Sequence, residues 1–213
     1  IELSNFEKND YILIPNRYLI DITFSKDTKI LDEIAEIFTG WQITTKGLEE
    51  RYNENGETSI IQITDIKNYQ VILNKKYNVE AEYKEKYQLK KSDIIITAKS
   101  TKVEFAVVED EEIAAIPAGT LTVLRPKEGF NPYYIVSFFE SEVGKNLIKL
   151  YQTGTVIKNL TPNNLKKIPI LIFDLKTQDK IAKEFKETID KINSLEKETA
   201  TLKDNLINNK HFI

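Results

Sequence analysis

Three polar stretches of the sequence combine basic side chains with hydroxyl, aromatic or glycine residues. Residues 41–58 carry Lys46, Arg51 and Tyr52, residues 98–104 carry Lys99, Ser100, Thr101 and Lys102, and residues 151–158 carry Thr153, Gly154, Thr155 and Lys158. Cationic groups bind phosphate oxygens, and hydroxyls hydrogen-bond to base edges. The stretches therefore indicate a surface that binds nucleic acid. Each stretch also fits an ordinary solvated loop. In the first stretch, Trp41 would then be anchored in the core.

Residue types that would support catalysis or metal binding are scarce. The sequence has one histidine, His211 near its end, and no cysteine, so an imidazole or thiolate site is unsupported. No phosphate-binding or dinucleotide-binding glycine motif occurs. Asn131-Pro132-Tyr133-Tyr134 is similar to the Asn-Pro-Pro-Tyr motif of adenine methylases, but it lacks the second proline and fits the start of a helix. We therefore expect no catalytic residue, no metal and no cofactor.

The composition indicates a folded protein without a membrane segment. The chain has 213 residues, of which 41% are hydrophobic, and no apolar run of about 18 residues that would predict a membrane helix. The absence of cysteine fits a cytoplasmic protein. The net charge is −3, whereas domains that bind nucleic acid are usually basic. The acidic residues 109–112 must therefore point away from any DNA. The chain starts with Ile1 and has no methionine, which suggests a fragment of a longer polypeptide.

Apolar runs predict the strands that position the polar stretches. The predicted elements are a helical turn and a strand in 31–40, strands over 59–66, 89–97 and 105–108, and two short strands in 113–126. Residues 98–104 then form a hairpin tip, residues 25–29 a linker, and residues 41–58 a long loop. Asn131 caps and Pro132 begins a helix that runs to about Leu147.

The segment from Tyr151 to Pro169 reads YQTGTVIKNLTPNNLKKIP. Thr161 and Pro162 predict a helix start, and Pro169 leads into a strand. With Gln178 and Ile181 after it, this segment resembles the end of a target-recognition domain in the specificity subunits of type I restriction–modification systems. Residues 89–97 resemble another strand of that domain, with Ser92 where the family most often has glycine. The resemblance extends over roughly residues 31–210.

Residues 178–209 contain no glycine or proline and predict one long helix. Its apolar or threonine residues recur at spacings of three and four, which is typical of a coiled coil. The residues expected to pair with another helix are Ile181, Phe185, Ile192, Leu195, Leu202 and Leu206. A helix of about 32 residues is about 48 Å long. One domain of this size would not bury the apolar stripe along that whole length. An alternative is a helix folded back on its own domain.

The resemblance implies an α+β fold, with a twisted, mostly antiparallel sheet and a long C-terminal coiled-coil helix. We expect an N-terminal extension over 1–30, a recognition domain over 31–175 and a pairing helix over 176–213. The resemblance further implies a non-catalytic module that reads a short duplex DNA sequence. It would direct a methylase and restriction complex to its target site. Its expected partners are double-stranded DNA, a DNA methylase subunit or domain, and a second copy through the helix.

Two other functions stay open at this stage. Residues 10–19 resemble the end of an adenine-specific DNA methylase, so the chain could be the C-terminal specificity domain of a self-contained N6-adenine methyltransferase. The acidic isoelectric point of about 5.5 would instead suit a coiled-coil adaptor that binds no DNA.

Overall fold

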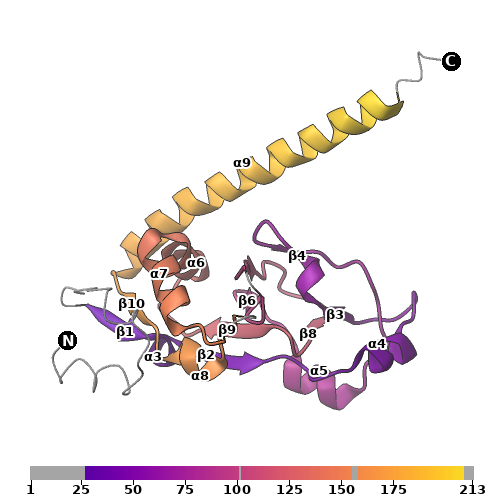
Figure 1. Cartoon of the computed structure of the whole chain (residues 1–213), viewed down its shortest axis with the longest axis horizontal. Coiled ribbons are helices and arrows are strands. Elements are labelled where there is room, and N and C mark those ends of the chain that lie inside the picture. The colour runs from indigo at the N-terminus through magenta and orange to yellow at the C-terminus, as the bar shows by residue number, and fades with distance from the viewer. Residues whose placement is uncertain (1–26, 101, 155–157, 209–213) are drawn as a thin grey trace.

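The computed structural model describes residues 27–100, 102–154 and 158–208, the last three of these by their backbone alone. Figure 1 shows a mixed α/β body from which one long C-terminal helix projects. The residues expected to form the N-terminal extension lie almost entirely outside the described part.

The body is built on a four-stranded antiparallel sheet, as predicted. Its strands, in spatial order, are β2 (Ala35–Thr39), β9 (Thr122–Pro126), β6 (Ile94–Ile96) and β7 (Phe105–Val107). Strands β6 and β7 form the predicted hairpin, in which Ile95 pairs with Ala106. The apolar runs therefore identified the four strands of this sheet correctly, whereas the strand predicted over 59–66 is divided into Ser59–Ile61 and Ile66–Lys67 by a helical turn at Ile63–Asp65.

Three two-stranded sheets surround this central sheet. They pair β1 (Thr28–Ile30) with β10 (Pro169–Leu171), β3 (Ser59–Ile61) with β8 (Ala115–Pro117), and β4 (Ile66–Lys67) with β5 (Gln70–Val71). The β3–β8 pair is parallel, whereas the other two are antiparallel. The prediction of a linker over 25–29 was wrong, because Thr28–Ile30 hydrogen-bonds to a strand about 140 residues later.

Short helices cover the sheets. They are α3 (Leu31–Ile34), α4 (Thr45–Arg51), η1 (Ile63–Asp65), α5 (Ala81–Tyr87), α6 (Pro132–Glu140), α7 (Glu142–Tyr151) and α8 (Pro162–Lys166). Residues 41–58 are not one loop, because Thr44 caps α4 by accepting a hydrogen bond from the Gly47 amide. The helix predicted to run to about Leu147 is divided at Ser141, which ends α6 and caps α7. The caps predicted at Asn131 and Thr161 are confirmed.

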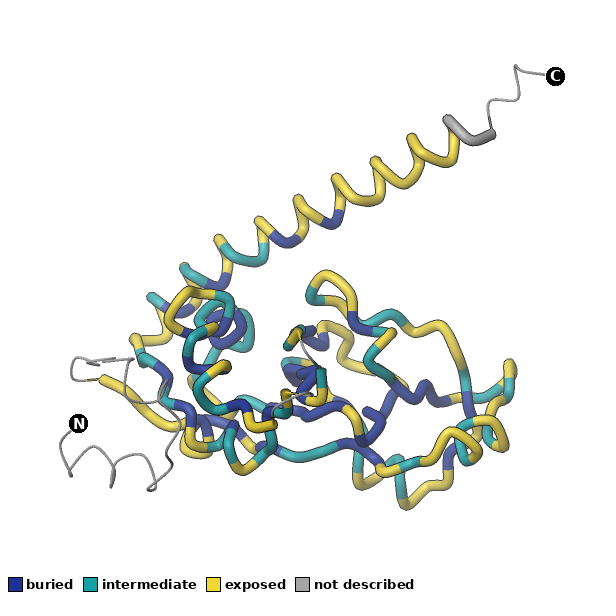
Figure 2. Tube along the Cα trace, viewed as in Figure 1, coloured by how far each residue is buried: buried dark blue, intermediate teal, exposed yellow. Residues whose placement is uncertain are grey.

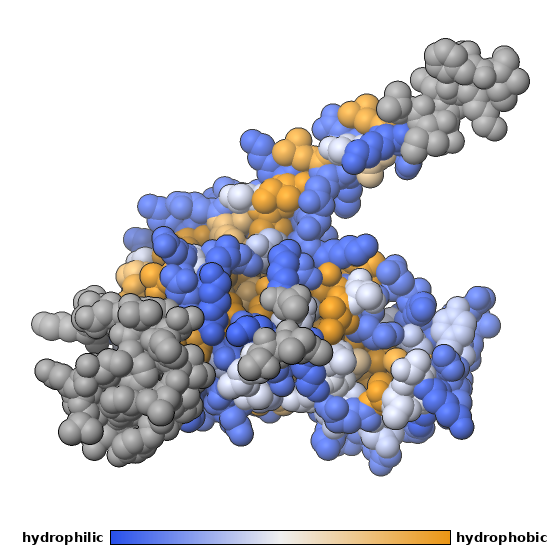
Figure 3. All heavy atoms as spheres, in the orientation of Figure 1, coloured by the Kyte–Doolittle hydropathy of each residue, from blue (hydrophilic) through white to orange (hydrophobic). Residues whose placement is uncertain are grey.

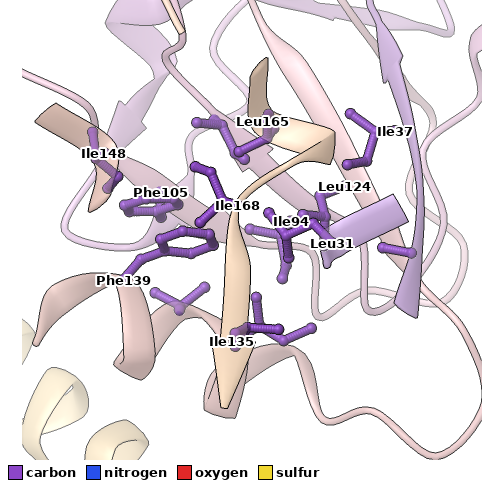
Figure 4. Packing of buried hydrophobic residues seen from close by; sticks show 14 of the residues in the cluster. Leu31, Ile37, Ile94, Phe105, Leu124, Ile135, Phe139, Ile148, Leu165 and Ile168 are labelled. Carbon is purple, nitrogen blue, oxygen red and sulfur yellow. The ribbon is translucent and has the colours of Figure 1, made fainter. Parts of the chain in front are cut away.

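The core lies on both faces of the central sheet, because side chains alternate along a strand. Ile94 and Ile96 of β6 pack with helices α6 and α7 on one face, and Ile95 packs with Val123 on the other. In the first cluster the rings of Phe105 and Phe139 stack with centroids 5.4 Å apart (Figure 4). A third cluster contains Trp41, which is buried as expected.

The long helix α9 (Leu175–Asn208) contacts the body as far as Glu196, which accepts a hydrogen bond from Asn68. Ala182 and Ile189 are buried, and Ile181 and Phe185 pack against the core of the body. Beyond Asn193 every described side chain is exposed (Figure 2). At 1.5 Å per residue, the 34-residue helix is about 51 Å long.

The alternative of a helix folded back on its own domain is therefore confirmed for part of the helix only, and pairing of the rest with another helix stays a prediction. Its first turns fold back on the body and its last turns project. Ile181 and Phe185, predicted for pairing with another helix, use at least part of their apolar surface within the chain.

Candidate nucleic-acid interface

The hairpin tip and the glycine turn lie next to each other, although more than 50 residues separate them. The Leu160 amide donates to the Ala98 carbonyl at 2.9 Å, which joins the start of the tip to the end of the turn. Thr153 and Asn159 close the turn through two backbone hydrogen bonds of 2.9 and 2.8 Å. Two of the three polar stretches thus contribute to one surface, which we call the tip–turn surface (described residues 98–100, 102–104, 153–154 and 158–159).

The tip residues are tied to the fold in different ways. Lys99 Nζ donates to the Gly119 carbonyl at 3.1 Å, which holds the tip against the turn between β8 and β9. The Lys102 ammonium is 82% exposed and lies 2.9 Å from Glu104, which raises the pKa of Lys102. Ser100 Oγ accepts a hydrogen bond from the Lys102 amide. Thr101 lies outside the described residues. Lys102 is therefore the tip cation that is presented most directly to solvent.

The glycine turn presents exposed groups beside the tip. Gly154 has a φ of +99°, a left-handed conformation that glycine adopts without a steric cost. Thr153 and Lys158 are exposed, and the Thr153 hydroxyl donates to the Asn159 carbonyl at 3.4 Å. Thr155 lies outside the described residues. The predicted donors Thr153 and Lys158 are thus placed on the same surface as Lys102.

The predicted DNA-binding residues of the third polar stretch lie apart from this surface, although Gln42 at its start donates to the same Gly119 carbonyl as Lys99. Helix α4 lies at the far end of the body from α8, which follows the glycine turn (Figure 1). The Lys46 side chain is 84% exposed, and within the described part of the chain its ionic partner is Glu50 at 3.7 Å. Tyr52 packs edge-on against Tyr77 and donates to Glu54.

Arg51 has a structural partner that the sequence did not reveal. Its guanidinium donates to both carboxylate oxygens of Glu80, at 2.6 and 3.3 Å, and lies 5.2 Å from the centroid of the Trp41 ring. The hydrogen bond to Glu80 raises the pKa of Arg51. A contact between Arg51 and DNA stays a prediction, and it would have to compete with Glu80 for the donors of the guanidinium.

The acidic run lies at the opposite end of the hairpin from the tip. Strand β7 separates residues 98–104 from residues 109–112, as expected for acids that must avoid DNA. Lys186 of α9 binds Glu109 at 2.7 Å, and the Tyr133 hydroxyl also donates to this carboxylate. These two hydrogen bonds lower the pKa of Glu109. Glu109 thus has a structural role, in that it links α6 to α9.

A pocket of about 470 Å³ opens beside the tip, and the sequence reasoning missed it. Its walls come from the tip, the β4–β5 turn, the end of α6 and one side of α7. Lys145, Lys149 and Gln152 of this last wall follow each other at spacings of four and three, so they share one helix face. That spacing is visible in the sequence and could have identified the three as a group.

The end of α9 presents an apolar stripe in the positions that were predicted to pair. Ile192, Leu195 and Leu202 are 43%, 53% and 61% exposed. Figure 3 shows hydrophobic residues lying among charged ones along the projecting helix. The side chain of Leu206 lies outside the described residues.

Neither a metal site nor a membrane span is found in the described residues. No group of three or more potential metal ligands occurs among them. Of the helices in the described ranges, none is both long and apolar enough to cross a membrane.

Residues 25–204 match the family model of the type I restriction modification DNA specificity domain. The comparison with curated proteins found no match. Among solved structures, the chain is similar to a protein from work on complex assembly and conformational transition of the type I R-M system. That match has a TM-score of 0.61 and 15% identity, over 94% of this chain and 49% of the other.

Two further structures share the fold. The HsdS subunit from Thermoanaerobacter tengcongensis matches with a TM-score of 0.57 and 15% identity, over 84% of this chain and 41% of its own. The type I restriction-modification system S subunit from M. genitalium matches with a TM-score of 0.52 and 16% identity, over 87% and 46%. The chain therefore spans about half the length of each of these proteins.

Proposed function

The chain belongs to the type I restriction modification DNA specificity domain family, and on that basis we propose that it reads a short duplex DNA sequence. In this proposal it directs a methylase and restriction complex to that sequence. The module supplies contacts, and its partners supply the chemistry. Specificity subunits of this family are generally non-catalytic, in line with this division of labour.

The observation that carries the proposal is the hydrogen bond from Leu160 to Ala98. It unites two polar loops from distant parts of the chain into one surface that contains Lys102, Thr153 and Lys158. Exposed loops on a rigid sheet are suited to entering a DNA groove, where lysines bind phosphates and hydroxyls contact base edges. Lys46 and Tyr52 of the α4 region would contribute only if the DNA extended to the far end of the body.

The domain boundaries follow from the same proposal. Residues 31–175 would form the recognition domain, with β1 added at its start through its pairing with β10. Residues 176–213 would form the pairing helix, in which Ile192, Leu195, Leu202 and Leu206 face a second helix. A second copy of this chain would supply that helix through the same exposed apolar stripe of α9. A DNA methylase subunit or domain would be the other protein partner.

A selection experiment tests the proposal directly. The whole chain is incubated with random-sequence duplex DNA at about 0.1 M salt, where phosphate contacts are partly screened, and retained DNA is sequenced. We expect an enriched motif of a few base pairs. Retention without enrichment would indicate that the chain binds phosphates without recognising a sequence. No retention, with or without the methylase subunit, would favour the adaptor function.

A further inference from the structure

The pocket beside the hairpin tip has most of its charged groups paired within the chain. Lys102 binds Glu104 at 2.9 Å, and Lys145 binds Glu140 at 3.0 Å. The Asn68 amide donates to Glu196 of α9. These contacts account for both carboxylates that line the pocket. The remaining polar groups are therefore the ones available to a ligand.

Two of the remaining groups lie at the end of α7, since Lys149 is in its last turn and Gln152 is its C-cap residue. Gln152 is only 9% exposed, and within the described ranges its side-chain amide has no hydrogen-bond partner. Lys149 is exposed at the same wall and has no carboxylate partner among the described residues. Within the described residues the Gln152 amide is not a fully buried unpaired group, so it keeps access to the pocket and its donor and acceptor are available to a ligand.

The chemistry of the pocket fits one nucleotide. A glutamine amide offers a donor and an acceptor side by side, which matches the paired groups on a base edge. Val103, Phe105, Phe139 and Ile148 supply apolar wall against which a base can pack. The ammonium of Lys149, at residue spacing i, i+3 from Gln152, can bind the phosphate of the same nucleotide. The volume falls in the range of small-molecule sites.

We propose that this pocket takes one unstacked base of the bound DNA, with Gln152 reading its edge and Lys149 holding its phosphate. The inference rests on the proposed function, because it assigns a further recognition residue to the same DNA complex. The base must leave the stack, since Gln152 is buried within the pocket wall and a base that stays paired cannot reach it. Gln152 is then a specificity-determining residue that the tip–turn surface does not include.

An abasic scan of the selected motif tests this. At each position in turn, the partner nucleotide is replaced by an abasic site, which removes the pairing energy that opposes unstacking. The whole chain is compared with Gln152→Leu, which keeps the volume, and with Lys149→Gln. Gln70→Leu is the matched control, because Gln70 is exposed on β5 and does not line the pocket.

We expect one position at which the abasic partner tightens wild-type binding by about tenfold. Gln152→Leu should abolish that gain and the base preference there, with unchanged affinity for non-specific DNA and an unchanged melting temperature. Lys149→Gln should weaken the gain, and Gln70→Leu should preserve it.

Two results would overturn the inference alone. In one, the wild type enriches a motif but no abasic partner tightens binding. In the other, the gain persists in Gln152→Leu, and a loss of methylase-subunit binding in that variant would then identify a protein segment as the occupant. Failure of the wild type to enrich any motif would instead overturn the proposed function, and the inference with it.

Discussion

Asn131 and Gln178 bind each other at the junction between α6 and α9. The backbone amide of Asn131 donates to Gln178 Oε1 at 3.0 Å. Gln178 Nε2 in turn donates to the backbone carbonyls of Phe173 and Gly129 at 2.9 and 3.3 Å. Gln178 is 1% exposed, so water does not compete for these bonds. Because Asn131 also caps α6, this pair fixes the start of the long helix against the start of α6.

Replacing Gln178 with leucine should destabilise the protein by about 1–3 kcal/mol, because it leaves buried backbone groups unpaired. Urea unfolding of Gln178→Leu measures this free energy. Gln70→Leu is the control, since Gln70 is exposed and its change should stay within about 0.5 kcal/mol. Equal stabilities of the two variants would show that the junction contributes nothing.

Removing the two tip lysines should weaken DNA binding and flatten its dependence on salt. Each lost phosphate contact reduces the slope of log affinity against log salt by about 0.9, so Lys99→Gln/Lys102→Gln should lose up to about 1.8. Lys191→Gln/Lys197→Gln, two exposed positions on α9, is the control with the same charge change. An unchanged slope in the tip variant would reject the tip as a phosphate contact.

Acid should loosen the contact between Glu109 and α9. Hydrogen bonds from Lys186 and Tyr133 lower the pKa of Glu109 below 4.5, so the folded state favours the charged carboxylate. Its contribution to stability is therefore fully present above that value and is lost as the pH falls through the folded pKa. The difference in unfolding free energy between wild type and Glu109→Gln should be constant from pH 7 to about 5 and shrink at lower pH. A difference that stays constant down to pH 3 would contradict this assignment.

Charge on the apolar stripe of α9 should prevent self-association. Leu195→Glu/Leu202→Glu places two carboxylates in the proposed seam, where burial of a charge is costly. Sedimentation should show a dimer for wild type and a monomer for this variant. Ser194→Glu/Thr201→Glu adds the same charge with the same spacing on an adjacent exposed face and should remain dimeric. A monomeric wild type would assign the stripe to a different partner.

Local signals predicted the elements whose ends are set by short-range chemistry. Asn131-Pro132 and Thr161-Pro162 begin helices as expected, because a capping side chain and a proline act within one turn. Ser92 also fits its place in the sequence. Its φ is +74°, a left-handed conformation that favours glycine, which is the residue that the family resemblance led us to expect there.

Long-range pairing accounts for what the sequence concealed. The partner of Arg51 is Glu80, and that of Thr28–Ile30 is Pro169–Leu171, and neither pair has a local signature. Helix α4 was missed because Gly47 and several charged residues hide its period, although Thr44 caps it. Gln152 was overlooked for a similar reason, since only the folded walls around it make its unpaired amide conspicuous.

The hairpin that separates Lys99 and Lys102 from residues 109–112 gives an overall acidic molecule a built-in polarity. As such a molecule diffuses towards a polyanion such as DNA, the electric field of the polyanion attracts the basic tip and repels the acidic end. The encounter is then oriented before any atom touches, and collisions through the wrong face are suppressed. A net charge of −3 is thus compatible with fast, correctly aligned capture of DNA, provided that the ionic strength is low enough for the field to reach.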